Sequence, residues 1–153
     1  MKKINKMMET IELLNKDCIC LFKMGNFYQA YGRDAYIISF LLNYKIDMQN
    51  SEVGFPINSI NKVLAKIENE KINYITLDSR NNYDVDLKQD YKKLNRYDKV
   101  YTKAREYINI KIRIDKIYDN LMNSIDKKEI RKIVGSVEKL IDEGREIQSN
   151  TVN

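Results

Sequence analysis

One segment determines how the rest of the chain can be arranged: Leu21-Phe22-Lys23-Met24-Gly25-Asn26-Phe27-Tyr28-Gln29-Ala30-Tyr31. The nearly continuous apolar run from Cys18 to Phe22 is typical of a strand buried on both faces. Gly25 follows it, and three aromatic residues then fall within five positions. We therefore expect a strand whose aromatic end, residues 25–29, is presented to solvent, although aromatic residues at a strand end are also typical of an ordinary core.

The segments on either side predict helices and two more strands. In chain order we expect an amphipathic helix at 3–15, a helix at 35–42 capped by Asp34, a turn at Gly54-Phe55-Pro56, a helix at 58–71 capped by Asn58, a strand at 72–77 and a short edge strand at 83–87. The strand at 72–77 should add to the first one. The expected fold class is therefore α/β (α+β), with a mixed β-sheet flanked by helices over residues 1–88.

Residues 89–148 differ in composition, because they contain no proline and no glycine before Gly135. Isoleucine at every second position from 108 to 114 would suit a strand. A three-four apolar repeat from Tyr107 to Leu121 continues into the flanking sequence, however, and favours a long helix. Asp126 and Glu129 form a D-x-x-E capping box that opens a second helix with the same repeat. We expect an antiparallel helical hairpin here, followed by a disordered tail at 149–153.

A hairpin of two helices leaves much of each apolar face uncovered. Each face stays exposed unless it packs on the first domain or on another molecule. We therefore expect the C-terminal helices to associate with a second copy of the chain or with a partner protein.

The composition argues against several classes of function. The 153 residues suit one domain with an appendage, and the absence of histidine removes the usual general base at neutral pH. The only cysteines, Cys18 and Cys20, have neither the spacing nor the partners of a zinc site, and the sequence has no P-loop. We expect no enzyme activity, no metal and no cofactor.

Charge and hydropathy bear on partners and location. The 27 basic and 22 acidic residues give a net charge of +5, which is compatible with nucleic acid, with an anionic membrane surface or with neither. No apolar run approaches the length of about 20 residues that spans a bilayer, and Met1-Lys2-Lys3 does not open a secretory signal. We expect a cytoplasmic protein with no membrane partner.

The motifs of residues 21–78 occur in an order and spacing that resemble those of a known protein family. Residues 21–35 read Leu-Phe-Lys-Met-Gly-Asn-Phe-Tyr-Gln-Ala-Tyr-Gly-Arg-Asp-Ala, and Gly-Phe-Pro at 54–56 and Val-Leu-Ala-Lys-Ile at 63–67 follow. About the first half of the chain thus resembles the amino-terminal mismatch-recognition domain, domain I, of the MutS DNA mismatch repair family. That family reads roughly Phe-Arg-x-Gly-Asp-Phe-Tyr-Glu at the matching place. The resemblance does not extend to the family's lever, clamp and ATPase domains, and implies a free-standing domain joined to a helical hairpin.

The resemblance assigns roles to two residues. In the family, a phenylalanine enters the minor groove and stacks on a mispaired base, while a glutamate two positions later hydrogen-bonds that base. The matching residues here are Phe27 and Gln29. Strand alternation then places Phe27 in solvent and Tyr28 in the core.

Two amides stand where the family has carboxylates. Asn26 replaces an aspartate and Gln29 replaces the glutamate. An amide both donates and accepts hydrogen bonds and repels phosphates less than a carboxylate does, but it lacks the charge-dependent selectivity of a carboxylate beside a base. Lys23 and Arg33 flank this tip as candidate phosphate contacts, or as ordinary solvated charges. The basic and aromatic run at 88–103 would similarly suit a nucleic-acid backbone or the solvated face of a helix.

Two functions of different classes follow. The leading one is a non-enzymatic DNA-binding domain that inserts an aromatic wedge at mispaired or distorted duplex sites, with Phe27, Gln29, Asn26, Lys23 and Arg33 at the interface. The alternative is a protein-interaction or oligomerisation module that keeps the MutS-like fold without mismatch specificity. The same residues would also suit RNA.

Overall fold

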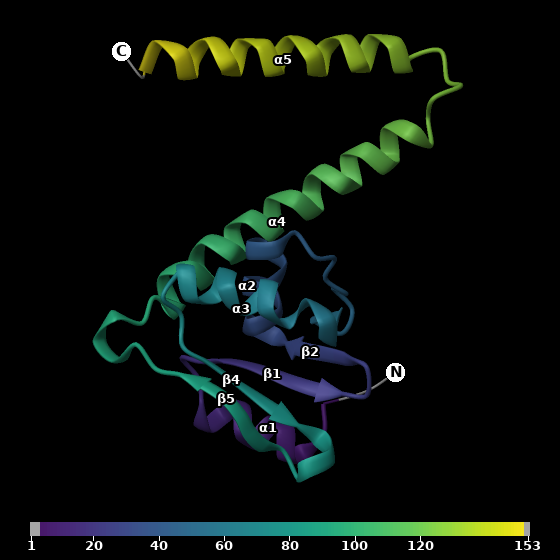
Figure 1. Cartoon of the computed structure of the whole chain (residues 1–153). Coiled ribbons are helices and arrows are strands. Elements are labelled where there is room, and N and C mark those ends of the chain that lie inside the picture. Colours follow the sequence, from purple (N-terminus) through teal and green to yellow (C-terminus); the bar gives the residue numbers. More distant parts are fainter. Residues whose placement is uncertain (1–3, 152–153) are drawn as a thin grey trace. The chain divides into compact units, whose positions relative to one another are not determined.

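The computed structural model describes residues 4–151 of the chain (Figure 1). One compact unit ends at Ile110 and a second begins at Lys111. In chain order the elements are α1 (Lys6–Leu14), β1 (Ile19–Met24), β2 (Phe27–Tyr31), α2 (Gly32–Leu42), β3 (Glu52–Pro56), η1 (Ile57–Ser59), α3 (Ile60–Asn69), β4 (Tyr74–Asp78), η2 (Ser79–Asn81), β5 (Asp84–Gln89), η3 (Lys92–Leu94), α4 (Tyr97–Met122) and α5 (Ile130–Thr151). The predicted helix at 3–15 is α1, and its residue 3 lies outside the described residues.

The sheet has five strands in the order β3-β2-β1-β4-β5. β1 and β4 are parallel, with Ile19 opposite Tyr74, and the other neighbouring strands are antiparallel. The parallel pair needs a long crossover, which the chain between β1 and β4 supplies. The prediction of a mixed sheet flanked by helices is confirmed, as are the strand that adds to the first one, β4, and the edge strand, β5.

The segment that we expected to form one strand with a solvent-exposed aromatic end is in fact a β-hairpin. β1 and β2 are antiparallel with Met24 opposite Phe27, so that Gly25 and Asn26 alone form the turn. Gly25 has a φ of 63°, a left-handed conformation that a type II′ turn requires at its first central position and that glycine adopts without strain. The expected strand end at 25–29 is therefore wrong, because Phe27 begins a second strand.

Different helices cover the two faces of the sheet. Figure 1 shows α2 and α3 on one face and α1 on the other. The larger core joins α2, α3 and the first half of α4 to β1, β2, β3 and β4. In the smaller core, Met8 of α1 packs with residues mainly of β1 and β4, namely Cys20, Phe22, Tyr31, Ile75 and Leu77. Beyond α1, the part of this face formed by β2 and β3 is accessible to solvent at Phe27 and Gly54.

Three local features of the first unit differ from the expectation. The predicted turn at 54–56 is the end of an edge strand, β3, where the missing N–H of Pro56 is tolerated. α2 begins at Gly32, so Asp34 is a buried residue of its first turn and not its N-cap. The 3₁₀ turn η1 precedes α3, and Asn58 lies within that turn instead of capping the helix.

The N-terminal half of α4 belongs to the first unit. Four side chains on one face of the helix are buried: Tyr97, Val100, Ala104 and Ile108. The first unit consequently extends to Ile110 and does not end at residue 88. The preference for a helix over a strand at 108–114 is confirmed, since α4 is continuous through that segment.

The second unit contains the rest of α4 and all of α5. Residues 123–129 form turns and α5 begins at Ile130, so Asp126 and Glu129 do not open the helix as a capping box. α5 includes residues 149–151 of the tail that was expected to be disordered, while residues 152–153 lie outside the described residues. Both helices expose apolar side chains: Ile114, Ile117, Tyr118, Met122, Ile133, Val134, Leu140, Ile141 and Ile147. The two predicted C-terminal helices are thus confirmed, and their packing as a hairpin stays a prediction.

Candidate nucleic-acid interface

Phe27 lies at the turn end of the β1–β2 hairpin, directly after Asn26. It is 48% exposed, whereas Tyr28 is 5% exposed, which confirms that strand alternation separates the two rings. Tyr28 stacks on Phe55 in the larger core with their ring centroids 5.6 Å apart. The residue next to Phe27 therefore anchors the strand, and the accessible ring is carried on a fixed backbone.

Gln29 shares the sheet face of Phe27, because residues two apart on a strand point the same way. Gly54 lies opposite Gln29 in β3. A Cβ at Gly54 would lie 2.9 Å from both Nε2 and Oε1 of Gln29, so the amide occupies space that any side chain at position 54 would fill. Within residues 4–151 the Gln29 side chain has no hydrogen-bond partner. An amide donor and acceptor is thus held beside Phe27 and is available to a ligand.

An open groove of about 360 Å³ adjoins these two side chains. The residues that line it are Phe27, Gln29, Lys45, Asp47, Glu52 and Gly54. The Asp47 carboxylate holds its own turn by accepting hydrogen bonds from the Asn50 side chain and the Gln49 backbone, and the bond from Asn50 is the main cause of its lowered pKa. Neither Lys45 nor Glu52 forms an ion pair within the described part of the chain. The groove therefore offers a carboxylate, Glu52, and a cation, Lys45, that are in no ion pair among these described residues, although the charge of Lys45 contributes to the lowered pKa of Asp47.

The other three predicted contact residues take different positions. Asn26 is exposed in the hairpin turn next to Phe27. Lys23 lies opposite Tyr28 in the sheet, so its side chain leaves the sheet on the face away from Phe27. Arg33 follows the far end of β2 and is not brought to this end of the hairpin.

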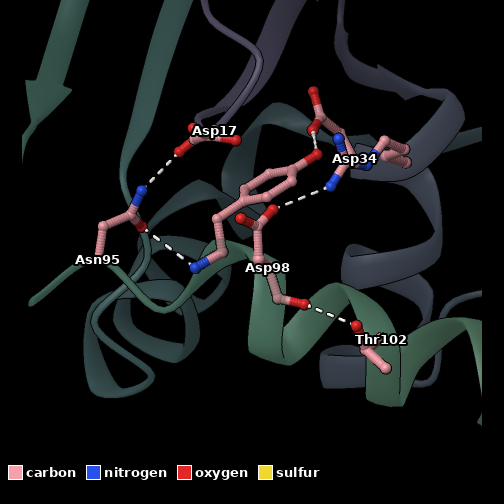
Figure 2. A network of polar contacts seen from close by, with 7 residues as sticks. Asp17, Asp34, Asn95, Asp98 and Thr102 are labelled. Carbon is pink, nitrogen blue, oxygen red and sulfur yellow. Dashed lines mark hydrogen bonds and ion pairs between the residues drawn. The ribbon is translucent and has the colours of Figure 1, made fainter.

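Arg33 belongs to a polar network at that far end of β2, and Figure 2 labels its partner Asp98 together with Asp34 of the same network. Its Nη2 lies 3.1 Å from Oδ1 of Asp98, and its guanidinium carbon lies 4.4 Å from the ring centroid of Tyr101. Exposed ion pairs and cation–π contacts of this kind contribute about 1 kcal/mol each or less. Both contacts join α2 to the N-terminal half of α4, so the guanidinium is engaged in packing the first unit.

Asp34 is the buried centre of the same network (Figure 2). Its Oδ2 accepts a hydrogen bond from the backbone N–H of Cys20 at 3.0 Å, and its Oδ1 accepts one from the hydroxyl of Tyr97. The carboxyl thereby links α2 to β1 and α4. Removal from water raises the pKa of Asp34 to about 7, although the two hydrogen bonds act in the opposite direction.

Glu12 of α1 and Asp34 line one pocket of about 380 Å³. Oε1 of Glu12 is buried without a hydrogen-bond partner among the described residues. Burial, and next the charge of Asp34, raises the pKa of Glu12 to about 7. Two interacting carboxyls with pKa values near neutrality titrate as a pair, and the direct consequence is a pH-dependent stability.

The chemistry available to the site is limited in kind. Among residues 4–151, no three His, Cys, Asp or Glu side chains form a group that could hold a metal ion. No helix in the same part of the chain is long and apolar enough to cross a membrane. Cys18 and Cys20 are free thiols, and burial raises the pKa of Cys18 to about 12, so its thiol stays protonated and unreactive. Aromatic stacking, amide hydrogen bonding and charge are what the site can use.

Residues 4–82 match a family model, MutS domain I. The match includes the hairpin, β3 and the groove between them, and it covers more than half of the 153-residue chain. The chain belongs to the MutS domain I family. At this level it is a MutS-like mismatch-recognition domain, and the resemblance seen in the motifs is confirmed. No curated protein matches the chain.

Four groove residues within the matched MutS domain I segment were not predicted from the sequence: Lys45, Asp47, Glu52 and Gly54. The interpretation of 54–56 as a turn concealed Glu52 and Gly54, because a turn has no alternating faces. Val53 and Phe55 are buried in the larger core, so Glu52 and Gly54 face the other way. Their alternation was a signal for a strand, and Pro56 obscured it.

Proposed function

We propose that this chain is a non-enzymatic DNA-binding domain that inserts Phe27 at mispaired or otherwise distorted sites in a duplex. The observation that supports it most directly is a half-exposed phenylalanine beside an amide without a partner in the described residues, on one face of a fixed strand. The family match supports the same role for this segment.

The wedge discriminates through the cost of unstacking. Opening one base step of a regular duplex costs a few kcal/mol, whereas a mispaired or bulged base has already lost part of its stacking. Stacking on an aromatic side chain contributes about 1–3 kcal/mol. Insertion is therefore favourable only where the step is already weakened, and Phe27 alone gives a preference for distorted sites.

Side chains around Phe27 supply the other contacts. The minor groove presents mainly hydrogen-bond acceptors, N3 of adenine and O2 of thymine, and Nε2 of Gln29 donates to them. Lys45 lines the groove and contacts a phosphate, while the exposed Asn26 side chain bonds the sugar-phosphate backbone. Lys23 extends from the opposite face of the sheet and is not one of these contacts.

Titration of labelled nucleic acids with the whole chain tests the proposal. Homoduplex, G·T-mismatched duplex, a duplex with one bulged base, single strand and RNA are compared at two salt concentrations. Phe27→Ala should weaken binding to the mismatched and bulged duplexes by about 5- to 100-fold, the effect of losing one base–aromatic stack. Homoduplex binding should change little.

The matched control is Tyr118→Ala, which removes a 61% exposed ring from the second unit. It should leave the affinity for every duplex unchanged. If Phe27→Ala and the wild-type chain bound the mismatched duplex equally well, the wedge would be refuted.

Gln29→Glu tests the base contact. A carboxylate repels phosphates, so affinity for homoduplex should fall. A mispair exposes N–H donors that regular pairing would occupy, and a carboxylate accepts hydrogen bonds from them, so the ratio of mismatched to matched affinity should rise. An unchanged ratio would argue against contact between Gln29 and the base.

The exposed apolar faces of the second unit favour a second function, association with another copy of the chain. On α5, exposed side chains recur every seven residues at Ile133, Leu140 and Ile147, and again at Val134 and Ile141. This spacing is typical of a helix–helix seam. We propose that α5 mediates self-association, and light scattering that shows a strict monomer at high micromolar concentration would contradict it.

A further inference from the structure

The groove beside Phe27 contains a second side chain able to contact a base, Glu52. It lies on the same face of β3 as Gly54, because the two are separated by one residue of the strand. Its backbone N–H and carbonyl both pair with Asp47, which fixes the position of the residue. Its carboxylate forms no hydrogen bond or ion pair within residues 4–151. A fixed backbone therefore carries a carboxylate that is available to a ligand.

The two carboxylates of the groove are not equivalent. Asp47 accepts hydrogen bonds from the backbone N–H groups of Gln49 and Asn50 and from the Asn50 side chain, so its acceptor capacity is used by the turn. Glu52 has no such partners among the described residues. Of the two, Glu52 is the one free to accept a hydrogen bond from a bound molecule.

A free carboxylate distinguishes base edges by their donors. In the minor groove, A·T and T·A pairs present acceptors alone, while guanine adds the one donor, its N2 amino group. A carboxylate is repelled by acceptors and binds the donor. In a G·T wobble pair the N2 amino group takes no part in pairing, so it is fully available to a protein.

We infer that this groove selects guanine-containing distortions, with Gln29 donating to a ring acceptor and Glu52 accepting from the guanine N2 amino group. The inference rests on the proposed function, since it requires Phe27 to enter the duplex beside the groove. Glu52 is then a specificity-determining residue, and it supplies the negative charge that Gln29 lacks.

Replacement of guanine by inosine tests the inference. Inosine forms the same wobble pair with thymine but has no N2 amino group. The whole chain is titrated with G·T and I·T duplexes of otherwise identical sequence. We expect about tenfold tighter binding to the G·T duplex, which is the discrimination typical of one good base contact. Glu52→Ala should abolish this difference.

A matched variant separates the contact from general repulsion. Asp47→Asn removes a negative charge from the same groove, so it should raise the affinity for both duplexes and keep their ratio. Glu52→Ala should raise the affinity for I·T relative to G·T until the two are equal. If the wild-type chain bound G·T and I·T with equal affinity and binding still depended on Phe27, the role of Glu52 would be overturned but the wedge would not. A G·T to I·T ratio that persists in Glu52→Ala would have the same meaning. Absence of binding to every duplex would overturn the proposed function as well.

Discussion

The two ends of β2 have opposite characters. At its start, Phe27 is half exposed and the Gln29 amide has no hydrogen-bond partner in the described part of the chain. Its other end leads directly into α2, where Asp34 is buried and is bonded to Cys20 and Tyr97. β1, α2 and α4 meet at the buried end, whereas the open end is next to the hairpin turn, and β3 pairs with β2 along its whole length.

The difference separates residues that hold the fold from residues that are free to bind. Buried polar groups lower stability unless they are paired, so Asp34 and its partners satisfy one another. At the open end the backbone is fixed by the stack of Tyr28 on Phe55, and the neighbouring side chains need no protein partner. Substitutions at the buried end should therefore change the free energy of unfolding, and substitutions at the open end should change binding.

The largest expected effect compares one aromatic residue from each region. Tyr97 is almost completely buried, and Tyr97→Ala removes both its ring and its hydrogen bond to Asp34. We expect a loss of about 3–5 kcal/mol in the free energy of unfolding. Phe27→Ala should change it by less than about 1 kcal/mol, because a half-exposed ring buries little surface on folding. Denaturant unfolding followed by circular dichroism measures both.

Tyr97→Phe is the control that separates the ring from the hydroxyl. It should cost about 1–3 kcal/mol, because the ring is kept and a buried acceptor on Asp34 loses its partner. If Phe27→Ala destabilised the chain as much as Tyr97→Ala, Phe27 would be a core residue and the contrast between the ends of β2 would disappear.

The next effect is a pH dependence that originates at the buried end. Asp34 and Glu12 have pKa values raised to about 7 in the folded chain, first by burial, against about 4 in an unfolded chain. Between these values the folded chain binds more protons, so the free energy of unfolding falls as pH rises. This contribution is fully present below about pH 4 and is lost above about pH 7, with a size on the order of a few kcal/mol for the fully buried Asp34.

Asp34→Asn isolates this effect. The amide accepts from the N–H of Cys20 and donates to the hydroxyl of Tyr97, so both contacts are kept without a titrating group. Denaturant unfolding measured from pH 5 to pH 8 should then show a much smaller slope than in the wild-type chain. Glu12→Gln tests the other member of the pair, and a full slope in the double variant would assign the pH dependence elsewhere.

The sequence predicts the features that follow from local apolar spacing or from the family motifs. It predicts less well the features that depend on contacts between residues far apart in the chain. The buried strand, the helix at 108–114 and the opposite faces of Phe27 and Tyr28 follow from apolar spacing and from the MutS domain I motifs. We did not predict β3, because local rules interpret Pro56 as a turn residue. Proline is tolerated there because β3 is an edge strand, and the local sequence does not show which strand lies at the edge of the sheet.

The burial of Asp34 could not be predicted for a different reason. Its partner Tyr97 is 63 residues away in sequence, and no local pattern shows that α4 returns to the start of α2. The same return removes Arg33 from the interface, because Asp98 and Tyr101 come with Tyr97. Local rules predicted that Asp34 caps a helix and that Arg33 contacts a phosphate. In the folded chain, Asp34 instead bonds Tyr97 and Arg33 pairs with Asp98.

The smallest expected effects concern the cations and test which end of β2 faces DNA. Lys45→Gln should reduce the slope of log K against log salt by about 0.9, because it removes one phosphate contact, whereas Lys23→Gln, on the other face of the sheet, should leave the slope unchanged. Arg33→Gln should leave that slope unchanged and lower the free energy of unfolding by about 1 kcal/mol or less, since its ion pair with Asp98 is exposed. A slope reduced by Arg33→Gln and unaffected by Lys45→Gln would place the duplex at the buried end of β2. The exposed ring of Phe27 would then have no part in binding.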